Sequence, residues 1–519
     1  MKLADFILSH DGDDLAALAL ARGRYATELE ADGVGLGGGS GGGSGVGSGA
    51  GLASGGGLGA GFASGGGLGT GLASGRRAGE AAFDLALTTL EVRRKLRDKV
   101  PQWHAVPSLV YPLRISGEQC SSSATARYKA SVALAASQQA LLTENACCHV
   151  PPDAVASTFG PKCLPSGMAR GGKRIADLTG GLGVDSWAFA QVFREVLYNE
   201  MRPELADAAV HNFRELGVTN IQVRNCALVP SGMASADRPE NGRTVSEILG
   251  PFRPDILFLD PARRAANGRK VFRLEDCQPD VLRLLPELLS ACPRLLLKLS
   301  PMADITLVCN QLGCVREVHV VSADGECKEL LLLLEAGWTG PHTLTVMEDG
   351  AVMGLGTEVP EPSLRDPSHT SPLRGCLWAP PSYVAEGGHG FGDLCPQSFQ
   401  LLFEPGKALL KAGAFDLPCS FGLQKLGQHT HLYTGEEIPE ALKPFGKTYK
   451  ILESLPLDKR SIKTIGQKYP RADVTARNIP LTSDQLRVKL GVRSGGDVHI
   501  FGLHSDALHS NLLLVARRA

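Results

Sequence analysis

Residues 175–185 read Ile-Ala-Asp-Leu-Thr-Gly-Gly-Leu-Gly-Val-Asp, and this stretch decides the fold of the chain. Its apolar start predicts a short strand, its glycines predict a tight turn, and the residues from Ser186 to about Phe193 predict a helix. Gly180, Gly181 and Gly183 let a ligand approach the backbone, and the helix N-terminus offers N–H groups that lack helical partners. The pattern therefore predicts a nucleotide-like ligand at the end of a strand.

The loop is compatible with two kinds of nucleotide ligand, a dinucleotide or SAM. A dinucleotide fingerprint, G-x-G-x-x-G, requires a third glycine, and Gly181-Leu182-Gly183 has none at the required offset. Asp177, just before the glycines, instead suits a ligand with a cationic amino-acid end, such as S-adenosyl-L-methionine (SAM). A strand-to-helix turn without any ligand is the structural alternative.

The elements after the loop favour SAM. A strand over residues 196–199 would end in Glu200, whose carboxylate can accept hydrogen bonds from both ribose hydroxyls of a nucleoside. A strand over 255–259 ends in Asp260-Pro261, which places Asp260 at the carboxyl edge of a parallel sheet, where such sheets bind ligands. Further strands are expected over 221–223, 294–299, 315–321 and 329–334, and helices over 203–216 and 279–290.

The composition excludes several classes of protein. The 519 residues include 53 Lys and Arg against 54 Asp and Glu, so a nucleic-acid partner must be argued from local patches. There is no long apolar run and no basic-then-apolar N-terminus, so we expect no membrane segment and a cytoplasmic location. Thirteen cysteines without a C-x-x-C pair indicate reduced thiols. Cys147-Cys148-His149 has no second ligand pair nearby, so we expect no metal site.

Composition also divides the chain into segments. We expect a helical N-terminal part at 1–32, a disordered Gly-rich insertion at 33–79, a continuation of the helical part at 80–150, an α/β domain with a Rossmann-like parallel sheet at 151–336, a small β-containing segment or linker at 337–400, and an α+β domain at 401–519. The alternative for the insertion, a glycine-rich RNA-binding tail, would need interleaved arginine or aromatic residues. Arg76 and Arg77 come only at its end.

Two stretches before the loop each allow two interpretations. The helix expected from Glu80 to Lys99 is rich in Arg and Lys, which indicates either a solvated face or a nucleic-acid contact. The segment 117–129 includes Gln119 and Thr125 and opens the next helix. In many methyltransferases a segment of this kind closes over the methionine end of SAM, whereas a serine-capped helix start is the structural alternative.

The C-terminal domain contains one basic stretch, between residues 443 and 493. Its basic residues are Lys443, Lys447, Lys450, Lys459, Arg460, Lys463, Lys468, Arg471, Arg477, Arg487, Lys489 and Arg493, and its acidic residues are Glu453, Asp458, Asp473 and Asp484. Tyr449 and Tyr469 are interleaved with them. The stretch predicts a nucleic-acid interface, with an ordinary charged surface as the alternative.

Motifs along most of the chain resemble those of the bacterial class I SAM-dependent methyltransferases that carry a C-terminal THUMP-like domain. They are Pro101-Gln102-Trp103, Tyr111-Pro112, Glu118-Gln119-Cys120-Ser121-Ser122, Thr125-Ala126-Arg127-Tyr128-Lys129, residues 177–185, Asp260-Pro261-Ala262-Arg263-Arg264, Lys298-Leu299-Ser300-Pro301-Met302, Glu326-Cys327-Lys328-Glu329-Leu330, residues 411–415, His431-Leu432-Tyr433, Arg477-Asn478 and Pro480-Leu481-Thr482. The resemblance implies a ferredoxin-like segment at 337–400 and a THUMP-like domain at 401–519. THUMP domains proper bind structured RNA. Asn225-Cys226-Ala227 departs from the family, because related enzymes often have an acid there that contacts adenine.

The expected activity is methyl transfer from SAM to a nucleotide in tRNA or rRNA. The residues expected to contact the cofactor are Gln119, Thr125, Asp177, Thr179, Gly180, Gly181, Gly183, Asp185, Glu200, Asn225 and Asp260. The residues expected to take part in catalysis are Asp260, Pro261, Arg263 and Lys298. A non-catalytic SAM-binding or RNA-binding protein, and a methyltransferase acting on a protein or a small molecule, are the alternatives. The oligomeric state is not predicted.

The acceptor atom stays open at this point. Methyltransferases that act on base amino groups usually have Asp-Pro-Pro-aromatic, whose aromatic ring stacks on an extruded base, whereas Asp260-Pro261 is followed here by Ala262 and Arg263. Arg263 or Arg264 is a candidate phosphate contact. Lys298 is a candidate to activate a ribose hydroxyl, and a plain strand-edge lysine is its structural alternative.

Overall fold

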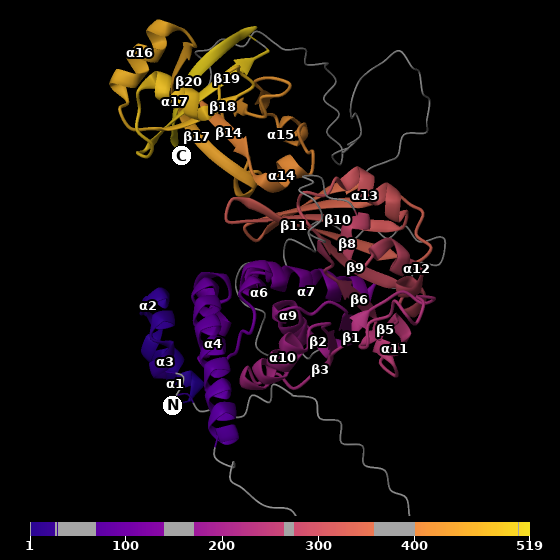
Figure 1. Cartoon of the computed structure of the whole chain (residues 1–519). Helices are drawn as coiled ribbons and strands as arrows, with labels where there is room; N and C mark the ends of the chain where they lie inside the picture. Colours follow the sequence, from indigo (N-terminus) through magenta and orange to yellow (C-terminus); the bar gives the residue numbers. More distant parts are fainter. Residues whose placement is uncertain are drawn as a thin grey trace, which may run out of the picture. The chain divides into compact units, whose positions relative to one another are not determined.

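The computed structural model describes residues 2–25, 29, 69–139, 171–263, 274–357, 400–506 and 508–519 (Figure 1). Most of the Gly-rich insertion, Cys147-Cys148-His149 and Arg264 lie outside these residues. The chain forms two compact units, one of Met1–Gln138 with Ala169–Phe258 and one of Gln139–Met168 with Leu259–Ala519. Within the described ranges, no helix is long and apolar enough to cross a membrane.

The first unit begins with helices that pack against one another. Short helices α1 (Leu3–His10), α2 (Leu15–Leu20) and α3 (Arg22–Tyr25) lie along the long helix α4 (Gly69–Lys99), as the indigo and purple ribbons of Figure 1 show. Their shared core includes Phe6, Leu18, Phe83 and Leu90. The predicted helical N-terminal part thus begins as three short helices, and Asp14 caps α2 by accepting a hydrogen bond from the N–H of Ala16.

Helix α4 differs from its prediction at one end. It ends at Lys99, before Pro101, as predicted, but it begins at Gly69 rather than at Glu80. Two of its cations, both half-buried, bind backbone carbonyls: Arg94 donates to those of His10, Asp11 and Asp13, and Lys99 donates to those of Gly117 and Glu118. Lys95 and Arg97 of the same helix are exposed, and for them both predictions, a solvated face and a nucleic-acid contact, still stand.

Parallel strands and helices follow α5 (Pro101–His104), α6 (Arg114–Gln119) and α7 (Ser123–Gln138). They are β1 (Gly171–Asp177), α9 (Val184–Val192), β2 (Phe193–Asn199), α10 (Pro203–Glu215), β3 (Ile221–Arg224), β4 (Ala227–Leu228), β5 (Gly242–Arg243), α11 (Val245–Leu249) and β6 (Ile256–Leu259). Strand β1 pairs in parallel with β2 and β6, and β2 pairs in parallel with β3. Asp177 is paired with Tyr198 on one side and with Phe258 on the other, so these strands end at one edge.

The second unit continues with strands that are mostly antiparallel. Its first elements are β7 (Ala262–Arg263), η1 (Leu274–Asp276), β8 (Cys277–Gln278), α12 (Val281–Ala291), β9 (Arg294–Leu299), α13 (Ile305–Leu312), β10 (Val315–Ala323), β11 (Glu326–Glu335), β12 (Thr343–Glu348) and β13 (Ala351–Thr357). Strands β10 and β11 form the predicted antiparallel pair, joined at Asp324-Gly325, where both residues have positive φ. The β-containing segment predicted after residue 336 is not separate, because β12 pairs in parallel with β10.

A further sheet and its helices make up the rest of the second unit. The elements are β14 (Leu401–Pro405), α14 (Lys407–Lys411), α15 (Leu417–Ser420), β15 (Gln424–Lys425), β16 (Tyr433–Gly435), η3 (Lys443–Phe445), β17 (Gly446–Pro456), α16 (Lys459–Lys468), β18 (Asp473–Arg477), α17 (Ser483–Leu490), β19 (Val498–Ser505) and β20 (Ser510–Arg518). The strand order is β15-β16-β14-β17-β20-β19-β18. Neighbouring residues such as Ile500 and Phe501 belong to different apolar clusters, as alternation along a strand requires.

Helix α14 is attached to the strands before it. The N–H of Ala408 donates to the buried carboxylate of Glu348 at 2.8 Å, and Lys411 donates to the carbonyl oxygen of Ala303 at 2.7 Å. A Cβ atom at Gly406 would lie 2.6 Å from that Glu348 carboxylate. The start of α14 therefore packs against β12 at a position that admits no side chain.

Candidate active site and nucleic-acid interface

The carboxylate of Asp177 lies at the end of β1, where the residue is 1% exposed. One oxygen accepts a hydrogen bond from the N–H of Thr179 at 3.1 Å, and the other accepts one from the Ser186 hydroxyl at 2.6 Å. Ser186 lies in the first turn of α9, so Asp177 connects the strand end, the loop and the helix start. Asp177 and Thr179, predicted to contact the cofactor, thus also hold the loop in shape.

Gly180 and Gly183 are required by the packing of the protein itself. A Cβ atom at Gly180 would lie 2.1 Å from the Tyr198 ring, and one at Gly183 would lie 2.8 Å from Phe213. Gly183 also has φ of +94°, which residues with side chains rarely adopt. The loop backbone therefore rests on aromatic rings from β2 and α10, a reason for glycine that the sequence pattern alone did not reveal.

Gly181 has the more open backbone. Among the described residues, a Cβ there would approach the Thr179 carbonyl oxygen at 4.0 Å, and φ is +54°. The Gly181 carbonyl accepts a hydrogen bond from the Tyr198 hydroxyl at 2.6 Å. Burial raises the pKa of Tyr198 well above its ordinary value, and the charges of Glu200 and Asp177 raise it further. The phenol therefore stays protonated and remains a donor to the loop.

Glu200 lies directly after β2, and its carboxylate also contacts the loop. One oxygen accepts the N–H of Gly181 at 2.9 Å, and the other accepts the N–H of Arg202 at 2.9 Å. These two bonds fix a buried carboxylate in one orientation. Because an ionised carboxylate has about four lone-pair positions, two backbone donors do not exhaust it. Glu200 can therefore hold the loop and also accept hydrogen bonds from a ligand.

Two asparagines hold the neighbouring strand ends together. The Asn225 amide donates to the Glu200 carbonyl at 2.8 Å from an exposed position after β3. The Asn199 amide donates to the carbonyls of Leu178 at 3.1 Å and Cys226 at 3.0 Å, and its oxygen accepts the Cys226 N–H at 3.2 Å. Asn199 was not predicted as a site residue, although an asparagine at the end of a strand, directly before the expected ribose acid, is a signal visible in the sequence.

A buried lysine connects the segment 117–129 to the start of α9. Lys129 in α7 is 0% exposed, and its ammonium lies 3.2 Å from Asp185 and donates to the Ser121 hydroxyl at 2.8 Å. The Ser121 hydroxyl in turn donates to Asp185 at 2.9 Å. Asp185, predicted as a cofactor contact, thus has two protein partners. The structure brings the predicted segment onto the glycine-loop helix.

The other two residues predicted in that segment lie in different surroundings. Thr125 is buried, and its hydroxyl donates to the Ser122 carbonyl at 3.2 Å. Gln119 is exposed at the last position of α6. The Ser122 hydroxyl accepts a hydrogen bond from the N–H of Thr125 at 3.2 Å, which is the serine cap that the structural alternative describes.

In the second unit, three ionisable side chains meet near the end of β9. The Lys298 ammonium donates to the Asp260 carboxylate at 2.5 Å and lies 3.9 Å from the Glu329 carboxylate. Pro261 is buried beside Asp260, and the Arg263 backbone pairs with Cys277. Two predicted residues, Asp260 and Lys298, are thus in direct contact. Glu329, which opens the buried run of β11, was not predicted as a site residue.

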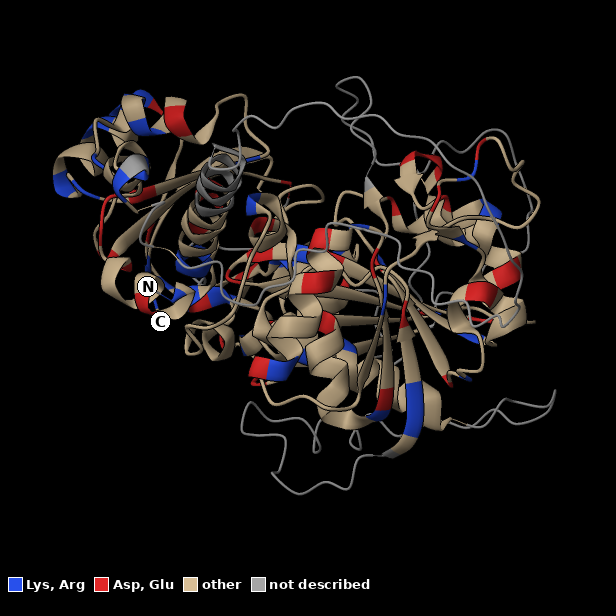
Figure 2. Ribbon diagram, turned by 60° about the horizontal axis from the view of Figure 1, so that its bottom comes forward, with Lys and Arg blue, Asp and Glu red and all other residues tan. Residues whose placement is uncertain are grey.

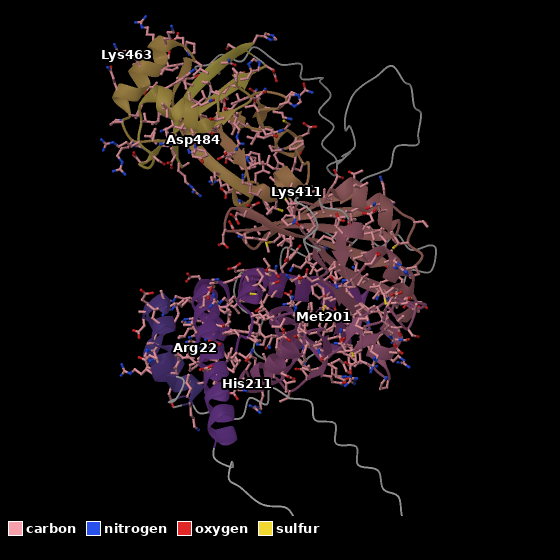
Figure 3. All side chains as sticks on the ribbon, viewed as in Figure 1. Arg22, Met201, His211, Lys411, Lys463 and Asp484 are labelled. Atoms are coloured by element: carbon pink, nitrogen blue, oxygen red, sulfur yellow. The ribbon has the colours of Figure 1, made fainter. Side chains whose placement is uncertain are left out.

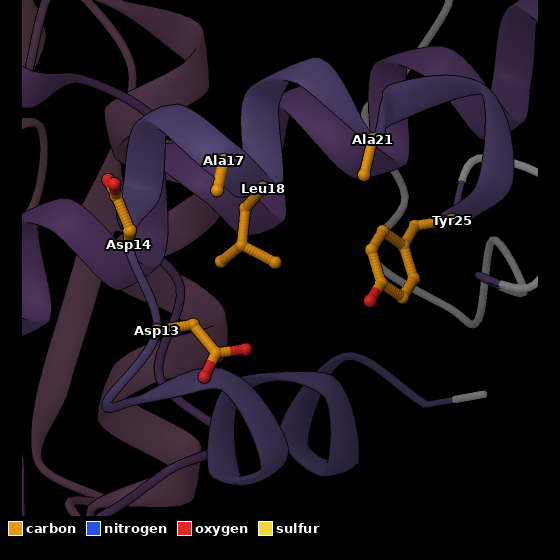
Figure 4. A pocket seen from close by; sticks show the side chains of 6 residues that line it. All are labelled: Asp13, Asp14, Ala17, Leu18, Ala21 and Tyr25. Carbon is orange, nitrogen blue, oxygen red and sulfur yellow. The ribbon is translucent and has the colours of Figure 1, made fainter.

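A pocket lies elsewhere in the first unit, among the N-terminal helices (Figure 4). Its lining residues are Asp13, Asp14, Ala17, Leu18, Ala21 and Tyr25. None of the predicted site residues lines it. The described residues also contain no group of three or more His, Cys, Asp or Glu that could hold a metal ion.

In the basic stretch of the C-terminal domain, some cations form ion pairs with acidic side chains and others do not. Lys443, Lys468, Arg477 and Arg487 form ion pairs with Glu440, Glu453, Glu404 and Asp484. In contrast, Lys459, Arg460 and Lys463 are exposed on α16 and form no salt bridge with a described residue. Helix α16 carries much blue in Figure 2, and Figure 3 labels Lys463 there and Asp484 on α17.

The two tyrosines of this stretch are not exposed stacking platforms. Tyr449 is buried against His499 and Phe501, and its hydroxyl donates to Glu404 at 3.1 Å. The Tyr469 hydroxyl bonds Glu453. The prediction of interleaved aromatics that contact nucleic acid is therefore wrong for Tyr449, because its ring is part of the core.

Family models match two adjacent parts of the second unit. A ferredoxin-like domain matches residues 401–442, and a THUMP domain-like family matches residues 446–518. The ferredoxin-like match thus lies after the segment 337–400 in which it was expected. The two matches meet at η3, just before β17.

Relatives of a larger part of the chain are methyltransferases. Uncharacterized SAM-dependent methyltransferases from strains CDC 1551 and H37Rv of Mycobacterium tuberculosis are 22% identical over 341 residues, which cover 65% of this chain and 79% of theirs. A tRNA/tmRNA (uracil-C(5))-methyltransferase of Aeromonas hydrophila is 28% identical over 117 residues, which cover 21% of this chain and 31% of that enzyme.

A solved structure extends the similarity to most of the fold. The crystal structure of a methyltransferase candidate from Porphyromonas gingivalis W83 is 28% identical and matches with a TM-score of 0.60. The match covers 84% of this chain and 90% of that one. The predicted α/β fold class, Rossmann-like with a THUMP-like C-terminal domain, is confirmed. The chain is therefore similar to SAM-dependent methyltransferases in sequence and in fold, its cofactor is SAM, and it carries a THUMP-like domain in its C-terminal part.

Proposed function

We propose that this methyltransferase modifies a nucleotide in RNA, either tRNA or rRNA. The observation that carries the proposal is the exposed cationic helix α16 within the THUMP-like domain. The partial match to an enzyme named for tRNA and tmRNA supports it. Phosphates attract clustered lysine and arginine side chains irrespective of sequence. An exposed cationic surface favours a polyanionic substrate over a small molecule.

The residues of the glycine loop fit SAM. Gly181 offers a backbone without a side chain, and Glu200 offers a fixed carboxylate for the ribose hydroxyls. Asp177 and the loop backbone would hold the amino-acid end. The bound cofactor supplies an already activated sulfonium methyl group, so the protein has chiefly to position the acceptor and accept its proton. In this proposal Asp260 contacts the acceptor group.

Binding of SAM tests the first half of the proposal. We expect calorimetric titration to show micromolar binding to the wild type and none to Asp177→Ala, because that variant releases the loop from β1 and α9. Glu200→Gln should weaken binding about tenfold, since a hydrogen bond to a charged group contributes about 1.5–3 kcal/mol. Glu204→Gln, at the start of α10, is the matched control and should bind SAM normally.

The outcome for the wild type matters most in that experiment. A wild-type chain that does not bind SAM would contradict the enzymatic proposal. A non-catalytic RNA-binding protein would then be the better interpretation. Equal binding by wild type and Asp177→Ala would instead show that the loop is held without this carboxylate.

RNA binding tests the second half. We expect Lys459→Ala, Arg460→Ala and Lys463→Ala together to weaken RNA binding uniformly across sequences. The slope of log affinity against log salt should become shallower by about 2, because each lost phosphate contact contributes about 0.7–0.9. Fluorescence anisotropy with structured RNA at several salt concentrations measures this.

Paired cations of the same domain provide the control for the salt experiment. Replacing Lys443, Arg477 and Arg487 by alanine removes the same number of charges from side chains that lie outside α16 and already have acidic partners. This control should change the slope much less. Equal slopes for both triple variants and the wild type would rule out α16 as the contact surface.

The expected cytoplasmic location remains part of the proposal. Cys226, Cys314, Cys327 and Cys419 are free thiols in the described part of the chain. Free thiols are the usual state in a reducing compartment, where RNA substrates are also present.

A further inference from the structure

Near the end of β9, an ammonium group lies between two carboxylates, and this arrangement narrows the choice of acceptor atom. We propose that Asp260, Lys298 and Glu329 form the acceptor site and that it takes a ribose 2′-hydroxyl of RNA. The inference rests on the proposed function, because it assumes an RNA substrate. It goes further by naming the chemical group that is methylated and by assigning Glu329 a part in the reaction.

Lys298 is held by its surroundings and is not a solvated strand-edge lysine. It lies on β9 opposite Leu331 of β11, with Leu299 opposite Leu330. Its side chain is 12% exposed, whereas that of Asp260 is 34% exposed and that of Glu329 is 4% exposed. The three groups therefore form a gradient from the interior to the surface, with the ammonium between the two carboxylates.

Charge explains why the lysine occupies this place. A buried carboxylate such as that of Glu329 is costly unless a cation or several donors accompany it. Lys298 lies 3.9 Å from Glu329 and contacts Asp260 at 2.5 Å, so a single ammonium serves both. Glu329 thus fixes the position of Lys298 from the interior side, and Asp260 is the member that reaches solvent.

Methylation of a hydroxyl group at this site would use both a carboxylate and an ammonium group. Its oxygen forms the new bond to the methyl carbon while the methyl–sulfur bond breaks, and that bond's electron pair stays on sulfur. The hydroxyl proton goes to the Asp260 carboxylate and then to water, which the exposed part of Asp260 can reach. An ammonium has three N–H donors, and one directed at the hydroxyl oxygen stabilises the negative charge that develops as the proton leaves.

Other acceptors fit the same residues less well. A base amino group is commonly presented by stacking on an aromatic ring, and Ala262 and Arg263 follow Pro261 here. Methylation at a pyrimidine carbon is commonly started by a thiolate, which adds to the ring. Cys277, whose backbone pairs with that of Arg263, is buried, and burial raises its pKa to about 11, so it is a thiol at neutral pH.

In an RNA substrate, one hydroxyl position of the ribose is available for methylation. Inside an RNA strand the 3′- and 5′-oxygens are esterified, so the 2′-hydroxyl is the one that every internal nucleotide offers, and it is both donor and acceptor. Asp260 would accept from it and Lys298 would donate to it. Lys298 and Asp260 are thus catalytic residues in this proposal, and Glu329 is a positioning residue that acts through Lys298.

The product identifies the acceptor directly. The full chain is incubated with total RNA and SAM carrying a labelled methyl group, and the RNA is then digested to nucleosides and separated by mass. We expect the label in 2′-O-methylnucleosides, and in alkali-resistant dinucleotides after treatment with base. Label in base-methylated nucleosides would overturn this inference and leave the proposed function standing. Label in no RNA, from a chain that binds SAM, would overturn the proposed function itself.

Variants then test the assigned roles. Lys298→Met should lower kcat at least about a hundredfold while the Kd for SAM stays within about twofold, since it removes a preorganised donor from the acceptor. Lys298→Arg keeps the charge beside Glu329 and should retain part of the activity, so it remains informative even if Lys298→Met fails to fold. Glu329→Gln should lower kcat about tenfold without changing KM for RNA.

A neighbouring lysine provides the matched control. Lys328 is adjacent in sequence to Glu329 and pairs with Glu326 at the surface. Lys328→Met should leave both kcat and the product unchanged. Wild-type kcat in Lys298→Met, or loss of SAM binding that accounts for its whole defect, would overturn the catalytic role of Lys298. An unchanged kcat in Glu329→Gln would overturn the positioning role of Glu329.

Discussion

Gly180→Ala should destabilise the first unit by about 3 kcal/mol, at the upper end of the usual cost of overpacking a core. The added methyl group would lie 2.1 Å from the ring of Tyr198, which is fully buried and cannot rotate away. Either the ring or the loop must shift. A shift of the ring would also remove the hydrogen bond from the Tyr198 hydroxyl to Gly181. Urea unfolding and calorimetric titration with SAM measure the two consequences, and we expect SAM affinity to fall by at least about tenfold.

Two other glycines separate crowding from the general effect of adding a methyl group. Gly172→Ala, with no described atom within 4 Å of the new Cβ, should be neutral. Gly181→Ala introduces strain from a positive φ without a close contact, so it should cost about 1 kcal/mol. If Gly180→Ala were no less stable than Gly181→Ala, the contact with Tyr198 would not be what requires glycine at 180.

Lys129→Met should destabilise the first unit by about 3–5 kcal/mol, because it leaves the Asp185 charge without its cation in a buried site. Asp185→Asn should have a cost of the same order, since it leaves the fully buried ammonium of Lys129 behind. The double variant should cost less than the sum of the two single variants by about 2 kcal/mol, because each single variant leaves the other charge unpaired, whereas the double variant removes both charges. Urea unfolding gives the free energies, and hydrogen exchange in α7 and α9 locates the change.

An exposed pair in the same unit serves as the comparison. Lys173 and Asp255 lie 3.0 Å apart, and both side chains are partly exposed. Lys173→Met should therefore cost less than about 1 kcal/mol. Additive costs for Lys129→Met and Asp185→Asn would mean that the two groups do not stabilise each other, and the connection between α7 and α9 would then have to come from packing alone.

Local patterns predicted the order of elements well. The apolar run before Asp177, the proline at the start of α10 and the glycine after it, and the apolar runs of β6 and β9 each carry their own evidence within a few residues. The same holds for the end of α4 at Lys99, which a proline follows within two residues. Elements of this kind depend on neighbours in sequence, and a single chain displays those.

The parts that were not predicted depend on partners distant in sequence. Gly183 must be glycine because of Phe213, and Asp185 is paired with Lys129, which precedes it by more than fifty residues. The pairing of β12 with β10 likewise depends on the sheet and not on the composition of β12. The N-terminal part shows a local signal that was not used: three short helices lie where one helical part was predicted, and the capping residue Asp14 marks the start of α2.

The residues of the candidate site likewise fall into those with a local sequence signal and those that depend on distant partners. Asp177, Glu200 and Asp260 could be identified because acids at strand ends stand out in sequence. Glu329 could not, because an acid at the start of a leucine-rich strand has no distinguishing neighbour, and its contact to Lys298 joins two strands that run antiparallel. The burial of Tyr449 was equally hidden, since the basic residues around it indicate a surface.

The junction at the start of α14 has an evolutionary consequence. The carboxylate of Glu348 occupies the space that a side chain at 406 would need, and it binds the backbone of Ala408. Positions 348 and 406 are therefore expected to change together among homologues: a lineage that loses the acid frees position 406 to vary, and a lineage that keeps it must keep glycine. Recombination that exchanged the C-terminal domain alone would have to bring a compatible partner for Glu348, which ties the inheritance of the two regions together.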